Sequence, residues 1–512
     1  MNCHLRSLAL TGWREFGMMH LVVSLLVVAP VALLVDIFAR PRSVKRLRSA
    51  QGSFLLVQIA LFIFGILLCV SGNAVLAAVL VLALNLLFVV ASNAKNDMLG
   101  EPLLFSDLAL IGAVFRHPQF YLSALERSQK LLGLVALAVL VAAFVWLFEA
   151  NLVTRLIGLG ISLTTAILMR ISLETKTFKA LASEPDADAD VAKLGLASTL
   201  LLYWIRWRGD AEKGTSLATD PYDPDLIDAS ECSPNAEPEI IVVIQCESFA
   251  DPVELFGKRG VELSNLKAAK KDAVLWGNLL VSGFGAYTMR TEYGVLFGRE
   301  EDDLGFRRYD PYLTALKDGA LALPNRLGGD QWRSVFVHPH DMRFYSRHRI
   351  LPEAGFSQLI DDSAFDRPSS GGGRYISDAA LAAKILEVAR IATERTFIYA
   401  VTIENHGPWS SEGEPLVAHY NRLVQAGDSM LGQLRDGIAE LGKPALLAFF
   451  GDHRPSIPGA SMPGGDRHTP YAVLRFDAAG RVISGGNQRK DLTPAQLHHA
   501  ILSLGKQSRK KD

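Results

Sequence analysis

Three apolar segments of the chain end in polar side chains that suit metal or phosphate binding. Each segment has the largely apolar character of a strand that is buried on both faces of a parallel sheet, and in 445–450 the apolar run is unbroken. Ligands of such sheets bind beyond the carboxyl ends of the strands, where side chains from neighbouring strands can meet. A carboxylate and an imidazole at this edge are suited to hold a divalent metal ion, although an aspartate there can also cap a helix. The polar residues are Glu247 after segment 239–245, Asn405 and His406 after 396–403, and Asp452 and His453 after 445–450.

A glycine-rich turn at 281–287 leads into a predicted helix that begins near Thr288. The amino end of a helix carries a partial positive charge and free N–H groups, and both favour anions. Beside a metal ion, a threonine hydroxyl in this position can ionise and attack phosphorus. The alternative is that Thr288 only caps the helix, with Thr291 or Glu292 completing a capping box. Both interpretations stay open at this point.

From about residue 238 onward the sequence alternates apolar strands with amphipathic helices. This alternation is typical of a mostly parallel sheet that is covered by helices on both faces. We predict strands at 239–245, 272–276, 334–338, 397–403, 445–450 and 471–475. We predict helices at 288–298, 311–318, 377–394, 416–441 and 493–505.

The amino-terminal part of the chain is dominated by five apolar segments that are long enough to cross a bilayer, given about 20 residues per span. Buried core helices are the alternative, but so many nearly uncharged segments in succession favour a polytopic membrane domain. The whole chain has a net charge of −1, which argues against nucleic acid as a general partner. The predicted spans are 19–38, 54–70, 74–91, 131–148 and 152–169.

Two shorter apolar segments are predicted not to span the bilayer: the first lies at the membrane interface or re-enters the membrane, and the second is an interfacial anchor helix. One follows the third span, at 103–115, and the other lies at 194–207, where Trp and Tyr stand beside Arg. The chain therefore divides into three predicted parts. They are a polytopic membrane domain at 1–175, an interfacial helix and linker at 176–236, and a soluble domain at 237–512.

The loop after the first predicted span is crowded with the basic residues Arg40, Arg42, Lys45, Arg46 and Arg48. The positive-inside rule places such a loop in the cytoplasm. Five spans would then leave the soluble domain in the cytoplasm as well. A sixth membrane-embedded segment, or an exception to the rule, would place the soluble domain outside.

The ordered motifs at 245–248, 285–288, 405–408 and 451–453, behind five predicted spans, resemble one known family. This is the lipoteichoic acid synthase and phosphoglycerol transferase family of the alkaline phosphatase/sulfatase superfamily. The resemblance extends over about 240–480 and the membrane architecture before it. It implies a multi-pass α-helical membrane domain followed by an α/β, sulfatase-like domain with a mostly parallel sheet.

The resemblance also implies roles for individual side chains. One divalent metal ion would be bound, usually manganese in this family, with zinc or magnesium as alternatives. Thr288 would be the nucleophile. An aromatic residue and an arginine would clamp the substrate, because a guanidinium can hold a phosphate oxygen with two hydrogen bonds. The implied metal ligands are Glu247, Thr288, Asp452 and His453, and the implied substrate-binding residues are His406, Tyr345 and Arg347.

Some features depart from the family pattern or point to other branches. One residue more than in the Gram-positive synthases separates Gly285 from Thr288, which keeps Thr291 as a rival nucleophile. A sulfatase needs a C/S-x-P-x-R motif, and the nearest match, at 232–236, has alanine in place of the arginine. The phosphoethanolamine transferase branch carries an Asp-His-Gly-Glu-Ser run, whereas Arg454 follows His453 here. His338, His340 and His468 are interpreted as loop histidines rather than second-site ligands.

The function implied by the resemblance is transfer of a phosphoglycerol or related phospho-alcohol group. The donor would be a phospholipid such as phosphatidylglycerol, and the acceptor a hydroxyl of a glycan or glycolipid. Catalysis would proceed through a phospho-threonine, at the outer side of the cytoplasmic membrane. The alternatives are a phosphoethanolamine transferase, a phosphodiester or sulfate ester hydrolase of the same superfamily, and a non-catalytic membrane scaffold.

Overall fold

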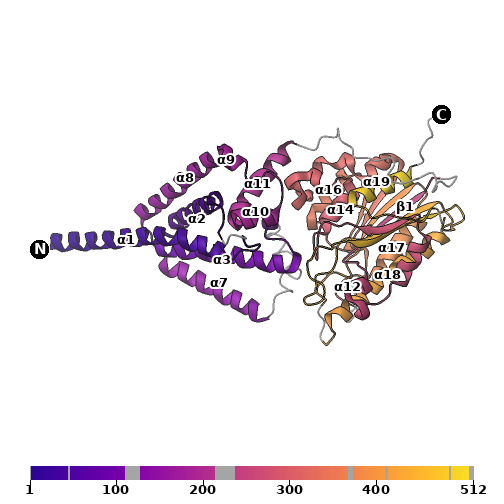
Figure 1. Cartoon of the computed structure of the whole chain (residues 1–512), viewed down its shortest axis with the longest axis horizontal. Helices are drawn as coiled ribbons and strands as arrows, with labels where there is room; N and C mark the ends of the chain where they lie inside the picture. Colours follow the sequence, from indigo (N-terminus) through magenta and orange to yellow (C-terminus); the bar gives the residue numbers. More distant parts are fainter. Residues whose placement is uncertain are drawn as a thin grey trace. The chain divides into compact units, whose positions relative to one another are not determined.

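The computed structural model of the chain describes residues 2–43, 47–109, 127–213, 237–366, 373–409, 413–483 and 486–506. The chain forms two compact units, Met1–Gly209 and Asp210–Asp512 (Figure 1). The described part of the first unit is helical, whereas the second is built around one large sheet.

Every predicted span of the first unit corresponds to a helix. Four helices are long and apolar enough to cross a membrane, namely α1 over its part Met18–Asp36, α2, α3 and α8. In α7 the apolar stretch is shorter, Leu131–Leu147. The predicted segment 103–115 is described only as far as residue 109, and part of the predicted linker, 214–236, also lies outside the described residues. The helices are α1 (Asn2–Asp36), α2 (Ala50–Ser71), α3 (Ala74–Leu99), α4 (Phe105–Ala109), α7 (Arg127–Leu147), α8 (Leu152–Glu174), α9 (Lys176–Lys179), α10 (Ala187–Leu194) and α11 (Leu196–Lys213).

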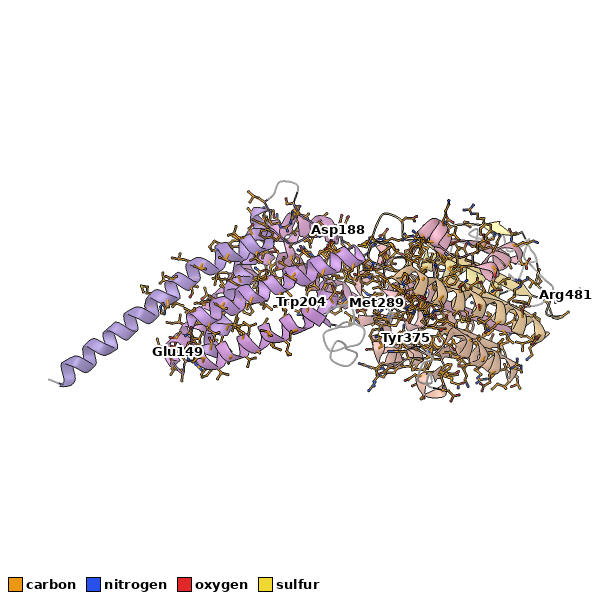
Figure 2. All side chains as sticks on the ribbon, turned by 90° about the horizontal axis from the view of Figure 1, so that it is seen from below. Glu149, Asp188, Trp204, Met289, Tyr375 and Arg481 are labelled. Atoms are coloured by element: carbon orange, nitrogen blue, oxygen red, sulfur yellow. The ribbon has the colours of Figure 1, made fainter. Side chains whose placement is uncertain are left out.

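Large apolar side chains project from the outer surfaces of these helices (Figure 2). In α7, Leu132 is 71% exposed and Trp146 is 87% exposed, and in α8, Leu152 is 67% exposed. So much exposed apolar surface on long helices is expected where lipid takes the place of water.

Polar contacts determine the directions in which the helices of the first unit run. At one end, the N–H of Glu149 donates to the carbonyl of Ser71 at 2.9 Å, so the α7–α8 turn lies beside the α2–α3 turn. At the other end, Arg48 forms a buried ion pair with Asp36 at 3.1 Å and donates to the carbonyl of Val191 in α10 at 2.9 Å. The first loop therefore lies at the same end of the helices as α10, opposite the α2–α3 turn.

An eight-stranded sheet with the order β4-β3-β5-β1-β6-β7-β2-β8 forms the centre of the second unit. Strands β4, β3, β5, β1 and β6 run parallel to their neighbours, and β7 is antiparallel to both β6 and β2. The sheet is therefore mostly parallel, as predicted. The strands are β1 (Ile240–Cys246), β2 (Leu275–Leu279), β3 (Arg333–Val337), β4 (Gln358–Ile360), β5 (Thr396–Val401), β6 (Ala445–Gly451), β7 (Thr469–Phe476) and β8 (Gln488–Arg489).

Helices cover both faces of this sheet, which explains the largely apolar runs in β1, β5 and β6 (Figure 1). On one face, α12 (Pro252–Phe256), α13 (Ser264–Asp272), α17 (Asp378–Arg390) and α18 (Leu416–Glu440) pack on a continuous apolar core. On the other face lie α14 (Thr288–Phe297), α16 (Arg347–Glu353) and α19 (Pro494–Gly505). A short helix, α15 (Leu323–Leu327), packs against α19.

Three local predictions differ from the structure. The helix predicted at 311–318 is two short 3-10 helices, Pro311–Leu313 and Ala315–Lys317, and the buried hydroxyl of Tyr312 in the first of them donates to Glu292 at 2.5 Å. The strand predicted at 272–276 begins three residues later, since the chain up to Asp272 belongs to α13. The short strands β4 and β8 were not predicted, because two or three residues give no periodic signal.

Candidate active site

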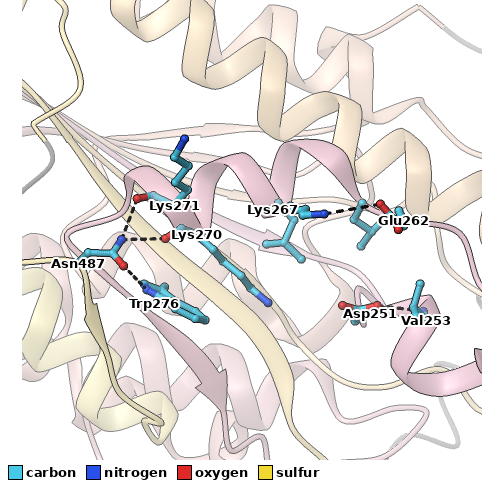
Figure 3. A pocket seen from close by; sticks show the side chains of 10 residues that line it. Asp251, Val253, Glu262, Lys267, Lys270, Lys271, Trp276 and Asn487 are labelled. Atoms are coloured by element: carbon cyan, nitrogen blue, oxygen red, sulfur yellow. Dashed lines mark hydrogen bonds and ion pairs between the residues drawn. The ribbon is translucent and has the colours of Figure 1, made fainter.

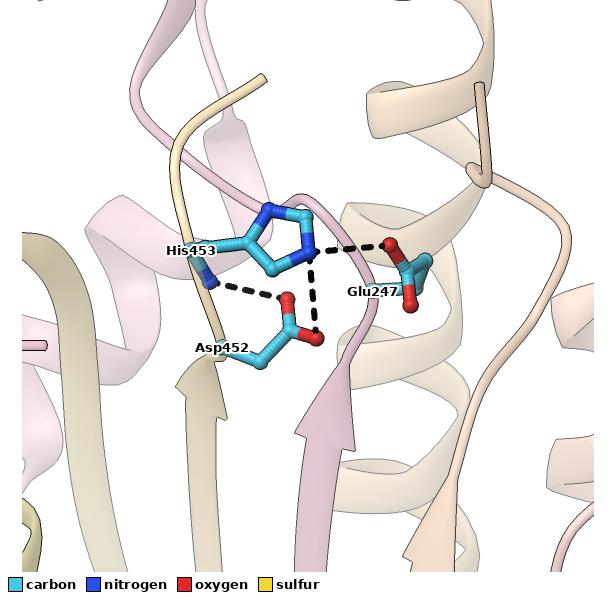
Figure 4. Close-up of side chains that lie close together, drawn as sticks. All are labelled: Glu247, Asp452 and His453. Atoms are coloured by element: carbon cyan, nitrogen blue, oxygen red, sulfur yellow. Dashed lines mark hydrogen bonds and ion pairs between the residues drawn. The ribbon is translucent and has the colours of Figure 1, made fainter. Parts of the chain in front are cut away.

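Glu247, Asp452 and His453 meet at the carboxyl edge of the sheet (Figure 4). Strands β1 and β6 are parallel neighbours, and Cys246 is paired with Gly451, so the residues that follow them are brought side by side. The Nε2 atom of His453 lies 3.3 Å from Glu247 Oε1 and 3.6 Å from Asp452 Oδ2. All three side chains are buried.

Local hydrogen bonds hold the two carboxylates and leave one oxygen, Asp452 Oδ2, without a hydrogen bond among the described residues, with His453 Nε2 3.6 Å away. Asp452 Oδ1 accepts the N–H groups of Ser248 and His453, each at 2.8 Å. The hydroxyl of Ser248 donates to Glu247 Oε1 at 2.9 Å. Asp452 Oδ2 is buried and has no hydrogen-bond donor in the described part of the chain. A buried carboxylate oxygen without a donor, beside a second carboxylate and an imidazole, fits a divalent metal ion.

The charges of this cluster are strongly coupled. Burial and the neighbouring Glu247 carboxylate raise the pKa of Asp452 to about 7. Burial lowers the pKa of His453, but the carboxylates of Asp452 and Glu247 outweigh this effect and raise it to about 9. Burial opposes ionisation of Glu247, yet the hydrogen bond and the charge of His453 lower its pKa to about 2. Two carboxylates thus share one imidazolium, and a divalent cation would balance them better.

Metal binding at this cluster is expected to strengthen as the pH rises toward 9. His453 carries a proton below a pKa of about 9 and must lose it before Nε2 can coordinate a metal ion. Affinity should therefore rise about tenfold per pH unit between pH 7 and 9, and more steeply below pH 7, where Asp452 must also lose a proton. Calorimetric titration of the metal-free, full-length protein with Mn²⁺ at several pH values measures the slope. An affinity that does not change over this range would contradict the assignment.

Thr288 is the first residue of α14, and its hydroxyl lies 3.5 Å from His453 Nε2. The preceding residue, Tyr287, has a left-handed φ of +76°, which is rare for a bulky side chain and marks a sharp, strained turn. Gly285, with φ of +68°, donates its N–H to the carbonyl of Arg454 at 2.8 Å. The turn is thereby tied to the residue after His453, and this contact directs the amino end of α14 at the cluster.

Thr291, the rival nucleophile, is placed differently. It is fully buried, and its hydroxyl donates to the backbone carbonyl of Asp452 at 2.8 Å. Thr288 is partly exposed and faces the side chains of the cluster. The hydroxyl of Thr291 therefore supports the loop, while that of Thr288 is open to a substrate.

His406 follows β5 at the same edge of the sheet and is close enough to Glu247 for their charges to interact. It is partly exposed, and its ring lies 5.9 Å from that of Tyr375, a neighbour that the sequence did not indicate. Asn405 supports this edge, because its amide donates to the carbonyl of Glu247 at 3.2 Å and its oxygen accepts the indole N–H of Trp409 at 2.9 Å. The third predicted motif therefore does converge with the other two.

Arg347 is brought to Glu292 of α14 rather than to the metal-ligand cluster. Its Nε and Nη2 atoms bind the two carboxylate oxygens of Glu292 at 2.9 and 2.6 Å, and both side chains are buried. The ring of Tyr345 lies 5.1 Å from the guanidinium. Among the described residues, no contact joins Arg347 to the cluster. The sequence did not reveal this pair, because the partners are 55 residues apart.

Two histidines outside the cluster have partners of their own. His338 is buried with Nδ1 3.0 Å from a backbone carbonyl of β5, and burial lowers its pKa well below the usual value. His468 lies in a second group with two carboxylates, Glu254 and Asp466. The guanidinium of Arg454 already sits in this group, 2.5 Å from Glu254, and supplies the positive charge there. A second metal ion is therefore not required to balance these carboxylates.

Comparison with known proteins identifies a family match and several proteins with a similar sequence or fold. Residues 239–504 match the family described as Sulfatase. The capsular polysaccharide biosynthesis protein RkpI of Rhizobium meliloti is 28% identical over 458 residues, which cover 86% of this chain and 84% of that protein. The lipooligosaccharide phosphoethanolamine transferase EptA of Neisseria meningitidis is 13% identical, with a TM-score of 0.51 over 95% of this chain and 94% of its own. The phosphoglycerol transferase GacH of Streptococcus pyogenes is 19% identical, with a TM-score of 0.42 over 60% of this chain and 86% of its own.

Proposed function

This chain belongs to the Sulfatase family, and we propose that it is a membrane-anchored, metal-dependent phosphoglycerol transferase. The superfamily expected from the sequence motifs is confirmed by the family match, and EptA, an integral membrane protein, shares the fold over 95% of this chain. The observation that carries the proposal is the hydroxyl of Thr288, which faces the buried Glu247, Asp452 and His453 cluster. A nucleophile at a helix amino end beside a metal-ligand set is suited to phosphoryl transfer.

The proposed reaction has two displacement steps at phosphorus. The hydroxyl of Thr288 gives up its proton and attacks the phosphodiester of phosphatidylglycerol, the bond to the diacylglycerol oxygen breaks, and that oxygen takes up a proton. A phosphoglyceryl group is then esterified to Thr288. In the second step an acceptor hydroxyl of a glycan or glycolipid loses its proton and attacks the same phosphorus, the bond to Thr288 breaks, and the threonine oxygen takes up a proton. Related phospho-alcohol head groups would follow the same steps.

The ligand set of the proposed metal ion is Glu247, Asp452, His453 and Thr288. Two carboxylates, a hydroxyl and one imidazole offer mainly oxygen ligands, which is why we propose manganese, with zinc or magnesium as alternatives. When bound, the ion supplies positive charge that favours the ionised threonine and offsets charge on the phosphoryl oxygens. The partial positive charge at the start of α14 acts in the same direction.

Substrate binding is proposed for His406, Tyr345 and Arg347. His406 lies at the edge of the site, partly exposed and near Glu247, where it can hold a phosphate oxygen or head-group hydroxyl. Arg347 is buried, and the N–H of Nε and one N–H of Nη2 are bound to Glu292, so only the N–H groups of Nη1 and the second N–H of Nη2 remain for a substrate. Its first effect is therefore to hold Glu292 and with it α14, the helix that begins at Thr288.

A glycan acceptor is supported by the relative RkpI, which is named for capsular polysaccharide biosynthesis. The proposal is tested with the full-length protein in vesicles that contain phosphatidylglycerol labelled in its head-group glycerol. Glycan from cells without the gene should become labelled as diacylglycerol accumulates. Diacylglycerol without labelled glycan would indicate a hydrolase. Transfer from phosphatidylethanolamine alone would indicate a phosphoethanolamine transferase, and metal binding without turnover would indicate a scaffold.

We further propose that the catalytic domain lies outside the cytoplasmic membrane, with the amino end of α1 in the cytoplasm. Helices α1, α2, α3, α7 and α8 reverse direction in turn, so the start of α1 and the start of α11 lie at opposite ends of five helices. The basic first loop then lies outside, against the positive-inside rule. Its charge is reduced by ion pairs, because Arg48 binds Asp36 and Arg40 binds Asp97.

A periplasmic alkaline phosphatase fused after Asp512 is accordingly expected to be active, and a fluorescent protein that folds only in the cytoplasm should be dark there. The same two reporters fused before residue 1 should give the reverse pattern, which serves as the internal control. An inactive but stable phosphatase fusion after Asp512 would place the domain inside and would exclude transfer to external glycans.

A further inference from the structure

A pocket of about 470 Å³ lies along the flank of α13, between this helix and β2 (Figure 3). This volume is within the range of small-ligand sites. Its wall is formed by Lys267 and Lys270 of α13, and its far end by Trp276 of β2 and Asn487. Asp251, in the segment after β1, lies at the other end.

The indole ring of Trp276 is held in place by Asn487. The side-chain oxygen of Asn487 accepts the indole N–H at 3.1 Å, and its amide donates to the carbonyls of Lys270 and Lys271 at the end of α13, both at 2.9 Å. Asn487 has a left-handed φ of +39°, so the loop before β8 is shaped around these contacts. The polar edge of the indole is satisfied within the protein, and a ligand in the pocket would meet its apolar ring.

Two cations gather at this ring without a carboxylate partner. The ammonium of Lys270 lies 5.9 Å from the ring centre and the guanidinium of Arg489 lies 5.4 Å from it. Within the described residues, neither Lys270 nor Arg489 forms an ion pair. Burial lowers the pKa of Lys270, the carboxylates of Asp251 and Glu254 offset this effect only in part, and the nearby charge of Arg489 adds to it.

The acidic residues of the pocket balance its cations only in part. Asp251 caps α12, accepting the N–H of Val253 at 2.9 Å, and its charge also acts on Lys270, while Glu262 lies 3.9 Å from Lys267. The charge that remains unbalanced is positive and lies beside Trp276. A ligand that fits this pocket would therefore carry an anionic group and a ring that can pack on the indole.

Two of the segments that line the pocket are connected along the chain to the candidate active site. Asp251 follows Glu247 in the segment after β1, and β2, which carries Trp276, leads through the glycine-rich turn to Thr288. A chain-like ligand lying along α13 would extend toward the carboxyl edge of the sheet. This arrangement suits a polymer more than an isolated ion.

We propose that this pocket binds an acidic sugar unit of the glycan acceptor, with its ring on Trp276 and its carboxylate at Lys270. Arg489 contacts the same indole from outside the pocket lining and adds positive charge there. The identification as an acceptor rests on the proposed function. The class of ligand, an anionic pyranose, rests on the indole ring, on the two cations without partners and on the size of the pocket.

The test is calorimetric binding of trigalacturonate to the full-length protein in detergent, at low ionic strength. Trigalacturonate should bind, and its methyl ester, which has the same rings without charge, should bind about tenfold more weakly or not at all. The double variant Lys270→Gln/Arg489→Gln should lose about tenfold or more in affinity. Lys258→Gln, at an exposed lysine outside the pocket, is the matched control and should bind as the parent does.

Three results would overturn the proposal. They are equal binding of the methyl ester, unchanged affinity in the double variant, and stronger binding of uridine monophosphate or inorganic phosphate than of trigalacturonate. The comparison of acid with ester uses the parent protein and does not depend on the folding of a variant. A Thr288→Val variant separates this proposal from the proposed function, because it should bind trigalacturonate normally. Normal binding by a parent protein that shows no transfer would refute the transferase alone.

Discussion

Replacing Thr288 by valine is expected to reduce turnover of phosphatidylglycerol by at least about 1,000-fold, because the side chain keeps its shape and loses the attacking oxygen. Thr291→Val is the matched control, since it removes a hydroxyl of the same type three residues away. It should lower stability by about 1 to 2 kcal/mol, because the carbonyl of Asp452 loses its buried donor, while most activity is retained. Diacylglycerol release by both variants, and their thermal unfolding, measure the two effects.

The covalent step can be located directly. Brief incubation with donor lipid and no acceptor, followed by proteolysis and mass spectrometry, should find a phosphoglyceryl group on Thr288 in the parent protein. Thr288→Ser should restore part of the activity and carry the same adduct, because it returns a hydroxyl to that position. An adduct on Thr291, or full activity of Thr288→Val, would mean that the nucleophile is misassigned.

Replacing Asp452 by asparagine is expected to weaken metal binding by at least about 100-fold. Asparagine can keep the hydrogen bonds that Asp452 Oδ1 accepts from Ser248 and His453, but it removes the negative charge from the atom that has no donor. The fold should therefore persist while the metal is lost. Elemental analysis of the purified full-length protein, together with diacylglycerol release, measures both outcomes.

Asp466→Asn is the matched control for this experiment. Asp466 belongs to the second carboxylate and histidine group, where Arg454 already supplies the positive charge. Its replacement should leave about one metal ion per chain. Equal metal content in the Asp452 variant and the parent would refute the ligand assignment, and loss of metal only in the Asp466 variant would move the site to the second group.

The fold class followed from the sequence because it depends on local patterns. Strands buried on both faces must be largely apolar, as β1, β5 and β6 are, and helices that cross a bilayer must be apolar over their length. The convergence of Glu247, His406 and Asp452 also followed, because the carboxyl ends of parallel strands share one edge. Short elements such as β4 and β8 had no such signal and were missed.

Contacts between distant side chains were decided only by the tertiary structure. Thr288 and Thr291 both lie in the first turn of α14, and only their contacts with the segment that follows β6 show that one hydroxyl faces the cluster and the other a carbonyl. From the sequence, Arg347 was expected to bind a substrate phosphate. In the structure it is paired with Glu292, because the buried charge of its guanidinium needs an anionic partner. The pocket at Trp276 depends on Asn487, which is 211 residues away along the chain. Periodicity and composition describe a single segment, whereas these partners are selected by burial, which joins segments that the sequence keeps apart.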